Sequence, residues 1–162
     1  MKKMKGRSYK ALKFGHLLFA GIWTGAAVTA LFLLTVAWNG ENVKETLLTV
    51  HRLDLLVIIP ANLLTLISGI LFSVYAGWGF VRHGWVTLKY IINLIPVLSG
   101  GIVIAPSLLK MLSIAEELGN AALHDSEFVH SLLTLRISFS VLLMLLVTAV
   151  YLSVFKPGRK IS

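Results

Sequence analysis

Residues 55–75 form an apolar segment that contains no charged side chain. A helix needs about 20 apolar residues to cross the hydrocarbon core of a bilayer, and this segment is long enough. Three further segments are similarly apolar, at residues 14–38, 90–109 and 136–155. Hydrophobic residues make up 57% of the chain and charged residues 14%. In a soluble domain about half of the residues are apolar and about a quarter are charged. We therefore expect an all-α integral membrane protein, a four-helix bundle that forms a single transmembrane domain over residues 1–162.

The distribution of charge predicts the orientation of these spans. Four spans place both termini on one side of the membrane. Eleven of the fifteen Lys and Arg lie on that side, in the amino-terminal segment, the turn between the second and third spans, and the tail. All seven Asp and Glu lie on the other side. By the positive-inside rule both termini are cytoplasmic and the protein lies in the plasma (inner) membrane. The basic residues indicate contact with anionic lipid in the bilayer, and nothing beyond charge supports nucleic-acid binding.

Prolines and capping residues predict where the helices bend and begin. Pro96 and Pro106 lie in the third span, and because proline removes a backbone hydrogen bond we expect a kinked third helix. Asn42, with Glu45 three residues later, has the spacing of a capping box, which predicts that the second helix begins before the bilayer does. Asp125 or Ser126 can cap the last helix.

One face of the second helix is polar. At about 100° per residue its polar positions fall within one arc of roughly 160°. They are His51, Asp54, Asn62, Thr65, Gly69 and Ser73. We expect this arc to face the bundle interior, because lipid offers no hydrogen-bond partners. Asp54 and Arg136 lie at similar depth, so we expect a structural ion pair that fixes the register of the second and fourth helices.

Two histidines lie near the outer ends of those same helices. His51 and His130 are at matching height, and two imidazoles that face each other across a bundle are a common way to bind b-type haem. Arg52 and Arg136 would then contact the haem propionates. In the alternative, the two histidines are ordinary interfacial residues, or they form a zinc or copper site together with His124. The chain has no cysteine, which excludes thiolate sites and thioether-attached haem.

A third histidine lies about one turn inside the cytoplasmic end of the first helix. An imidazole within hydrocarbon is unusual, which indicates a function for His16. Lys89 lies at nearly the same height on the third helix, although its ammonium group can also extend to the lipid headgroups. His83 is in the neighbouring turn. Gly21 and Gly25 form a small-xxx-small pair, and we favour packing within the bundle over a dimer contact.

Short motifs in two helices resemble those of known membrane proteins. The first helix, with His16 followed by Trp23 and Gly25, resembles the opening helix of small bacterial proteins of the HemJ and copper-resistance D types. The segment from Trp85 to Lys89 is similar to the Trp-x-x-x-Lys entry of the third helix in HemJ-like proteins. HemJ-like proteins bind haem and oxidise protoporphyrinogen, and copper-resistance D proteins are linked to copper import. The resemblance thus implies a haem or metal role for His16, together with Lys89.

These observations lead to one preferred function and two alternatives. We predict a multi-pass membrane protein that binds haem b for electron transfer or haem handling, with His51 and His130 as axial ligands and His16 at a second site. If the protein is an enzyme, we expect a haem-dependent membrane oxidoreductase. The alternatives are a copper or zinc transport accessory that uses the same histidines, and a structural subunit. A homodimer and a larger membrane complex both remain open.

Overall fold

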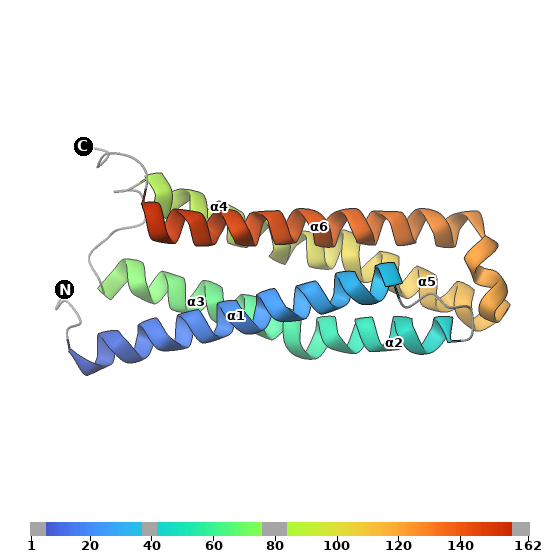
Figure 1. The fold of residues 1–162 in the computed structure, drawn as a ribbon, viewed down its shortest axis with the longest axis horizontal. Coiled ribbons are helices and arrows are strands. Elements are labelled where there is room, and N and C mark those ends of the chain that lie inside the picture. Colours follow the sequence, from blue (N-terminus) through green and yellow to red (C-terminus); the bar gives the residue numbers. More distant parts are fainter. Residues whose placement is uncertain (1–5, 37–41, 76–83, 157–162) are drawn as a thin grey trace.

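The computed structural model of the protein describes residues 6–36, 42–75 and 84–156, and all of its regular elements are helices (Figure 1). The first spanning helix is α1 (Arg7–Val36) and the fourth is α6 (Ser126–Phe155). The second consists of α2 (Val43–Leu53), the π-helical turn η1 (Asp54–Ile58) and α3 (Ile59–Tyr75). The third consists of α4 (Gly84–Ser99), the π-helical turn η2 (Gly100–Ile104), α5 (Ala105–Leu118) and the short 3₁₀ helix η3 (Gly119–His124).

Each of the four helices is long and apolar enough to cross a membrane. The expected all-α four-helix membrane bundle is therefore confirmed. The helix α1 begins at the end of the bundle where α6 ends, which we call the terminal end (Figure 1). The short helix η3, which connects α5 to α6, lies at the opposite end (Figure 1).

The second and third helices are both irregular in their middle. The turn η1 ends two residues before Pro60, and η2 ends two residues before Pro106. A proline ring collides with the carbonyl group one helical turn earlier and offers no N–H to it, and a wider π-helical turn relieves both problems. The kink expected in the third helix coincides with η2. The matching irregularity of the second helix was not expected.

The helix α1 is the centre of the packing. It contacts α3, α6 and α2, whereas α5 contacts α2 and α6, and α4 contacts α3 and α6. Small side chains of α1 allow this close approach, namely the buried Ala26, Ala27 and Ala30. Large buried side chains of the other helices fill the core beside them, including Met111, Phe128 and Phe139. A second, smaller core cluster around Trp85 and Leu152 lies toward the terminal end, where α4 packs on α6.

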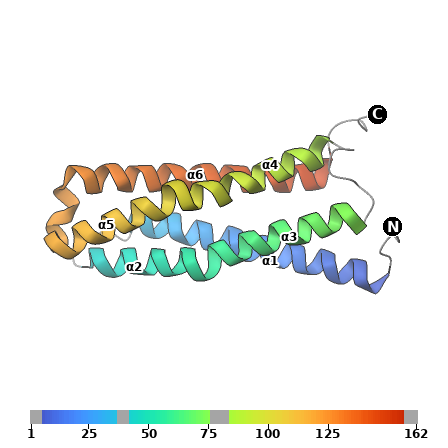
Figure 2. The ribbon, with the colours of Figure 1, turned by 180° about the vertical axis from the view of Figure 1, so that it is seen from behind.

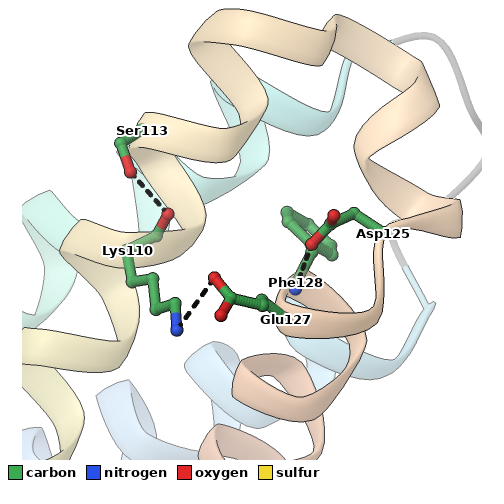
Figure 3. A network of polar contacts seen from close by, with 5 residues as sticks. All are labelled: Lys110, Ser113, Asp125, Glu127 and Phe128. Carbon is green, nitrogen blue, oxygen red and sulfur yellow. Dashed lines mark hydrogen bonds and ion pairs between the residues drawn. The ribbon is translucent and has the colours of Figure 1, made fainter.

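Side-chain contacts at the opposite end connect α5 to α2 and α6. Asp125 Oδ1 accepts a hydrogen bond from the backbone N–H of Phe128 (2.9 Å), so the predicted cap of the last helix is confirmed (Figure 3). Lys110 on α5 pairs with Glu127 on α6 at 3.1 Å (Figure 3), and Lys44 pairs with Glu116 at 3.0 Å. Asn42 precedes α2 but makes no side-chain cap hydrogen bond, so the predicted capping box is not formed.

The structure does not form the ion pair that we expected between Asp54 and Arg136. The ion pairs in the described part of the chain are the two named above. Arg136 Nε instead donates to the carbonyl oxygen of Leu34 at 2.7 Å. Leu34 lies in the last turn of α1, at the negative end of the helix dipole, which attracts cationic side chains. The clamp at this depth therefore joins α6 to α1 and not to the second helix.

The glycine pair of α1 does not pack within the bundle. Gly21 and Gly25 are both exposed. A Cβ atom added at either glycine would meet nothing within 4 Å beyond the backbone of the helix itself. The expectation of close intrabundle packing at these glycines is therefore wrong.

Candidate functional site

A cavity of about 280 Å³ lies between α1, α3, α4 and α6 in the terminal half of the bundle. Its wall is largely apolar and aromatic, with Trp23, Phe72 and Trp85 among the lining residues. Its polar lining residues come from all four helices. They include Lys13 and His16 on α1, Thr65 and Ser73 on α3, Lys89, Tyr90 and Asn93 on α4, and Ser153 on α6.

The ring of His16 is half-buried and fixed by α3. Its Nδ1 lies 2.8 Å from Ser68 Oγ, and the ring meets that of Phe72 edge to face at 5.6 Å between centroids. The single hydroxyl proton of Ser68 points to the carbonyl oxygens of Leu64 (2.7 Å) and Thr65 (3.0 Å). In the tautomer in which this proton stays with the carbonyl groups, His16 Nδ1–H donates to Ser68 Oγ. The lone pair of Nε2 is then available to a ligand.

Lys89 lines the same cavity from α4. Its Nζ lies 5.6 Å from the centroid of the Trp85 ring, one turn earlier on the same helix. The adjacent Tyr90 donates to the carbonyl oxygen of Gly69 at 3.1 Å and lies within hydrogen-bond distance of Ser73 Oγ. These contacts attach α4 to α3 beside the cavity. The structure thus brings His16 and Lys89 to one site, as their similar height suggested, whereas His83 lies outside the described residues.

Two buried polar atoms of the cavity wall have no partner in the described part of the chain. Trp23, only 1% exposed, has an unpaired Nε1–H, and Asn93 has an unpaired Oδ1. An unpaired buried polar group destabilises a protein by about 1–3 kcal/mol unless water or a ligand pairs with it. Sequence reasoning did not propose Asn93, although an amide in an otherwise apolar helix is itself a signal of function.

The histidines of the opposite end are not gathered into a metal site. His124 and His130 are exposed, whereas His51 is half-buried and its Nδ1 is buried without a partner in the described residues. The described residues contain no group of three or more His, Asp or Glu side chains arranged to bind a metal ion. The three-histidine site suggested by the sequence is therefore not assembled.

The proposed axial pair of haem ligands lies on helices that are diagonal in the bundle. His51 is on α2, which packs on α1 and α5, and His130 is on α6, which packs on α1, α4 and α5. Arg52, a predicted propionate partner, is exposed. Asp54 is 3% exposed and lies one helical turn from His51. None of these residues contributes to the wall of the cavity.

Comparison with known proteins adds one match. Residues 10–157 match the model of a family described as "Predicted integral membrane protein (DUF2269)". No curated protein and no solved structure matches the chain.

Proposed function

The chain belongs to the DUF2269 family of predicted integral membrane proteins, and we propose that this membrane protein binds b-type haem in the cavity, for electron transfer or haem handling. In this proposal His16 would hold the haem iron through Nε2, and the amine of Lys89 would be the candidate for a second protein ligand. The observation that carries the proposal is that two nitrogen-bearing side chains from different helices line one mostly apolar cavity.

The residues of the cavity fit such a group. A neutral imidazole is the commonest protein ligand of haem iron, and ligating histidines usually donate their other N–H to a fixed acceptor. Ser68 is that acceptor for His16. The cavity volume of about 280 Å³ lies just below the range of about 300–1,000 Å³ that is usual for small-molecule sites, so the cavity would hold no more than one ligand. When bound, a b-type haem would supply one-electron redox chemistry.

A bare copper or zinc ion suits this structure less well than haem. Protein zinc sites use about three or four side-chain ligands, and the described residues contain no cluster of that kind among His, Asp and Glu. A haem iron receives most of its nitrogen ligands from the macrocycle and needs only one or two from the protein. The cavity offers that number.

The resemblance to HemJ-like proteins supports the same site. Three of the residues that carry the resemblance, His16, Trp23 and Lys89, all line the cavity. The pair of His51 and His130 is less favoured, because His130 is exposed. By the positive-inside rule the cavity would open near the cytoplasmic face of the membrane.

The test is the absorption spectrum of the purified protein, prepared without added haem and again after addition of haemin. We expect a Soret band that His16→Ala abolishes and that His124→Ala, at an exposed histidine outside the cavity, leaves unchanged. A Soret band lost in His51→Ala or His130→Ala but not in His16→Ala would place the haem at the opposite end. Colourless protein that carries copper or zinc would support the transport accessory, and protein with neither would support a structural subunit.

A further inference from the structure

We infer that the cavity selects an organic anion, whose carboxylates bind at the terminal end beside Lys13, and so distinguishes a porphyrin dicarboxylate from its neutral ester. This inference rests on the proposed function for the shape of the ligand but does not depend on iron.

The charges around the cavity have one sign. Lys13 from α1, Lys89 from α4 and Lys156 at the end of α6 all line it, and no Asp or Glu is among the lining residues. The acidic side chains of the described residues lie in the opposite half of the bundle or beyond it. Cations brought together beside hydrocarbon repel one another and are favoured by a bound anion.

The hydrogen-bonding groups of the wall also favour a ligand that accepts. The hydroxyl groups of Thr24, Thr65 and Ser153 each donate to a carbonyl oxygen of the preceding turn, at 2.7–2.8 Å. The hydroxyl of Tyr90 donates within the protein as well. Groups of the wall that can donate to a ligand include the ammonium group of Lys13 and the unpaired indole N–H of Trp23. Asn93 Oδ1 is the one unpaired buried acceptor known among the described lining residues.

The order of residues along α1 gives the ligand a direction. Lys13, His16 and Trp23 all line the cavity, at spacings of three and seven residues that keep them on one face of the helix. At about 1.5 Å per residue, Lys13 lies about 4.5 Å nearer the terminal end than His16, and Trp23 about 10 Å deeper. The cationic group is therefore at the mouth and the aromatic wall is inside, which matches an amphipathic anion that enters with its apolar part first.

The test uses metal-free protoporphyrin and its dimethyl ester, with the full-length protein in nanodiscs of neutral lipid. Binding is measured by quenching of tryptophan fluorescence, since Trp23 and Trp85 both line the cavity. One charge-assisted hydrogen bond corresponds to roughly 10- to 100-fold in affinity, so the ester should bind weaker by at least about tenfold. Lys13→Gln should weaken binding of the dicarboxylate and leave the ester unchanged. The matched control is Lys10→Gln, because Lys10 is exposed on the same helix but does not line the cavity.

Three results would overturn the inference. First, the ester could bind as tightly as the acid. Second, Lys10→Gln could weaken binding as much as Lys13→Gln, which would show that only the general surface charge matters. In a further arm, phosphatidylglycerol is added to the nanodiscs. If it competes with the porphyrin in the wild type but not in Lys13→Gln, the anion at Lys13 is a lipid headgroup. The wild-type protein could also show no Soret band with haemin and yet bind metal-free porphyrin in a way that depends on Lys13. That result would refute the proposed function and would leave this inference intact.

Discussion

Replacing Ser68 by Ala tests whether the imidazole of His16 is positioned by α3. Ser68 is 6% exposed and its Oγ lies 2.8 Å from His16 Nδ1, a contact that joins residues 52 positions apart in the chain. The substitution removes the acceptor of the Nδ1 proton without adding bulk. The half-buried ring then loses its side-chain hydrogen bond to α3 and keeps its edge-to-face contact with the Phe72 ring.

The expected magnitudes follow from that contact. A hydrogen bond between membrane helices contributes about 0.6 kcal/mol on average, and a typical one in a soluble protein about 1 kcal/mol. Ser68→Ala should therefore lower the free energy of unfolding of the ligand-free protein by about 0.5–1.5 kcal/mol. The haem affinity should fall further, by about 10- to 100-fold, as it does when the partner of a metal-ligating histidine is removed.

Two assays separate these effects. Unfolding in mixed micelles with increasing sodium dodecyl sulfate gives the stability, and a haemin titration followed at the Soret band gives the affinity. The control is Ser153→Ala, because Ser153 also lines the cavity but its hydroxyl bonds only the carbonyl of Ala149. Equal haem affinities for Ser68→Ala, Ser153→Ala and the wild type would show that Ser68 does not position the ligating ring.

Further substitutions test other parts of the fold by the same unfolding assay. Asp54 and Arg136 are not paired, so a double-mutant cycle of Asp54→Asn and Arg136→Leu should give a coupling energy below about 0.5 kcal/mol. A larger coupling energy would show that the two side chains do interact. Asp125→Ala should destabilise the protein by about 1 kcal/mol through loss of the α6 cap, whereas Asn42→Ala should change the stability by only a few tenths, about 0.3 kcal/mol. A reversed order would contradict the assignment of the caps. Tyr90→Phe should cost about 1 kcal/mol, because it removes the hydroxyl that joins α4 to Gly69 on α3, and an unchanged midpoint would exclude that role.

The sequence predicts three features of the fold correctly. They are the number of spans, the position of the start of α1 and the end of α6 at the same end of the bundle, and the irregular third helix. Each depends on local properties, namely the length of apolar segments, their number, and proline within a helix. Which face of a helix contacts the neighbouring helices depends instead on the packing of the whole bundle. Depth along the membrane suggested that Asp54 and Arg136 should pair, but Arg136 is directed to Leu34 on α1. Depth also placed His16 and Lys89 together, and there the helix faces happened to agree.

The contacts of the cavity lay beyond sequence reasoning for the same reason. His16 and Ser68 are both polar positions on inner helix faces, yet nothing in either segment shows that they meet. The unpaired atoms of Trp23 and Asn93 are visible only when every neighbour is placed. The interruption of the second helix had a sequence signal in Pro60, which follows η1 by two residues.

The two π-helical turns divide the bundle into halves with different internal ties. The helices α2 and α5 lie on one side of η1 and η2 (Figure 2). There Lys44 on α2 pairs with Glu116 on α5, and Lys110 on α5 pairs with Glu127 on α6 (Figure 3). On the other side α3 and α4 line the cavity together with α1 and α6. π-helical turns are rare in proteins, lie frequently at functional sites and are a common cause of helix kinks. We therefore expect the second and third helices to bend most easily at η1 and η2. Amide hydrogen exchange should be faster at residues 54–58 and 100–104 than in the helices on either side.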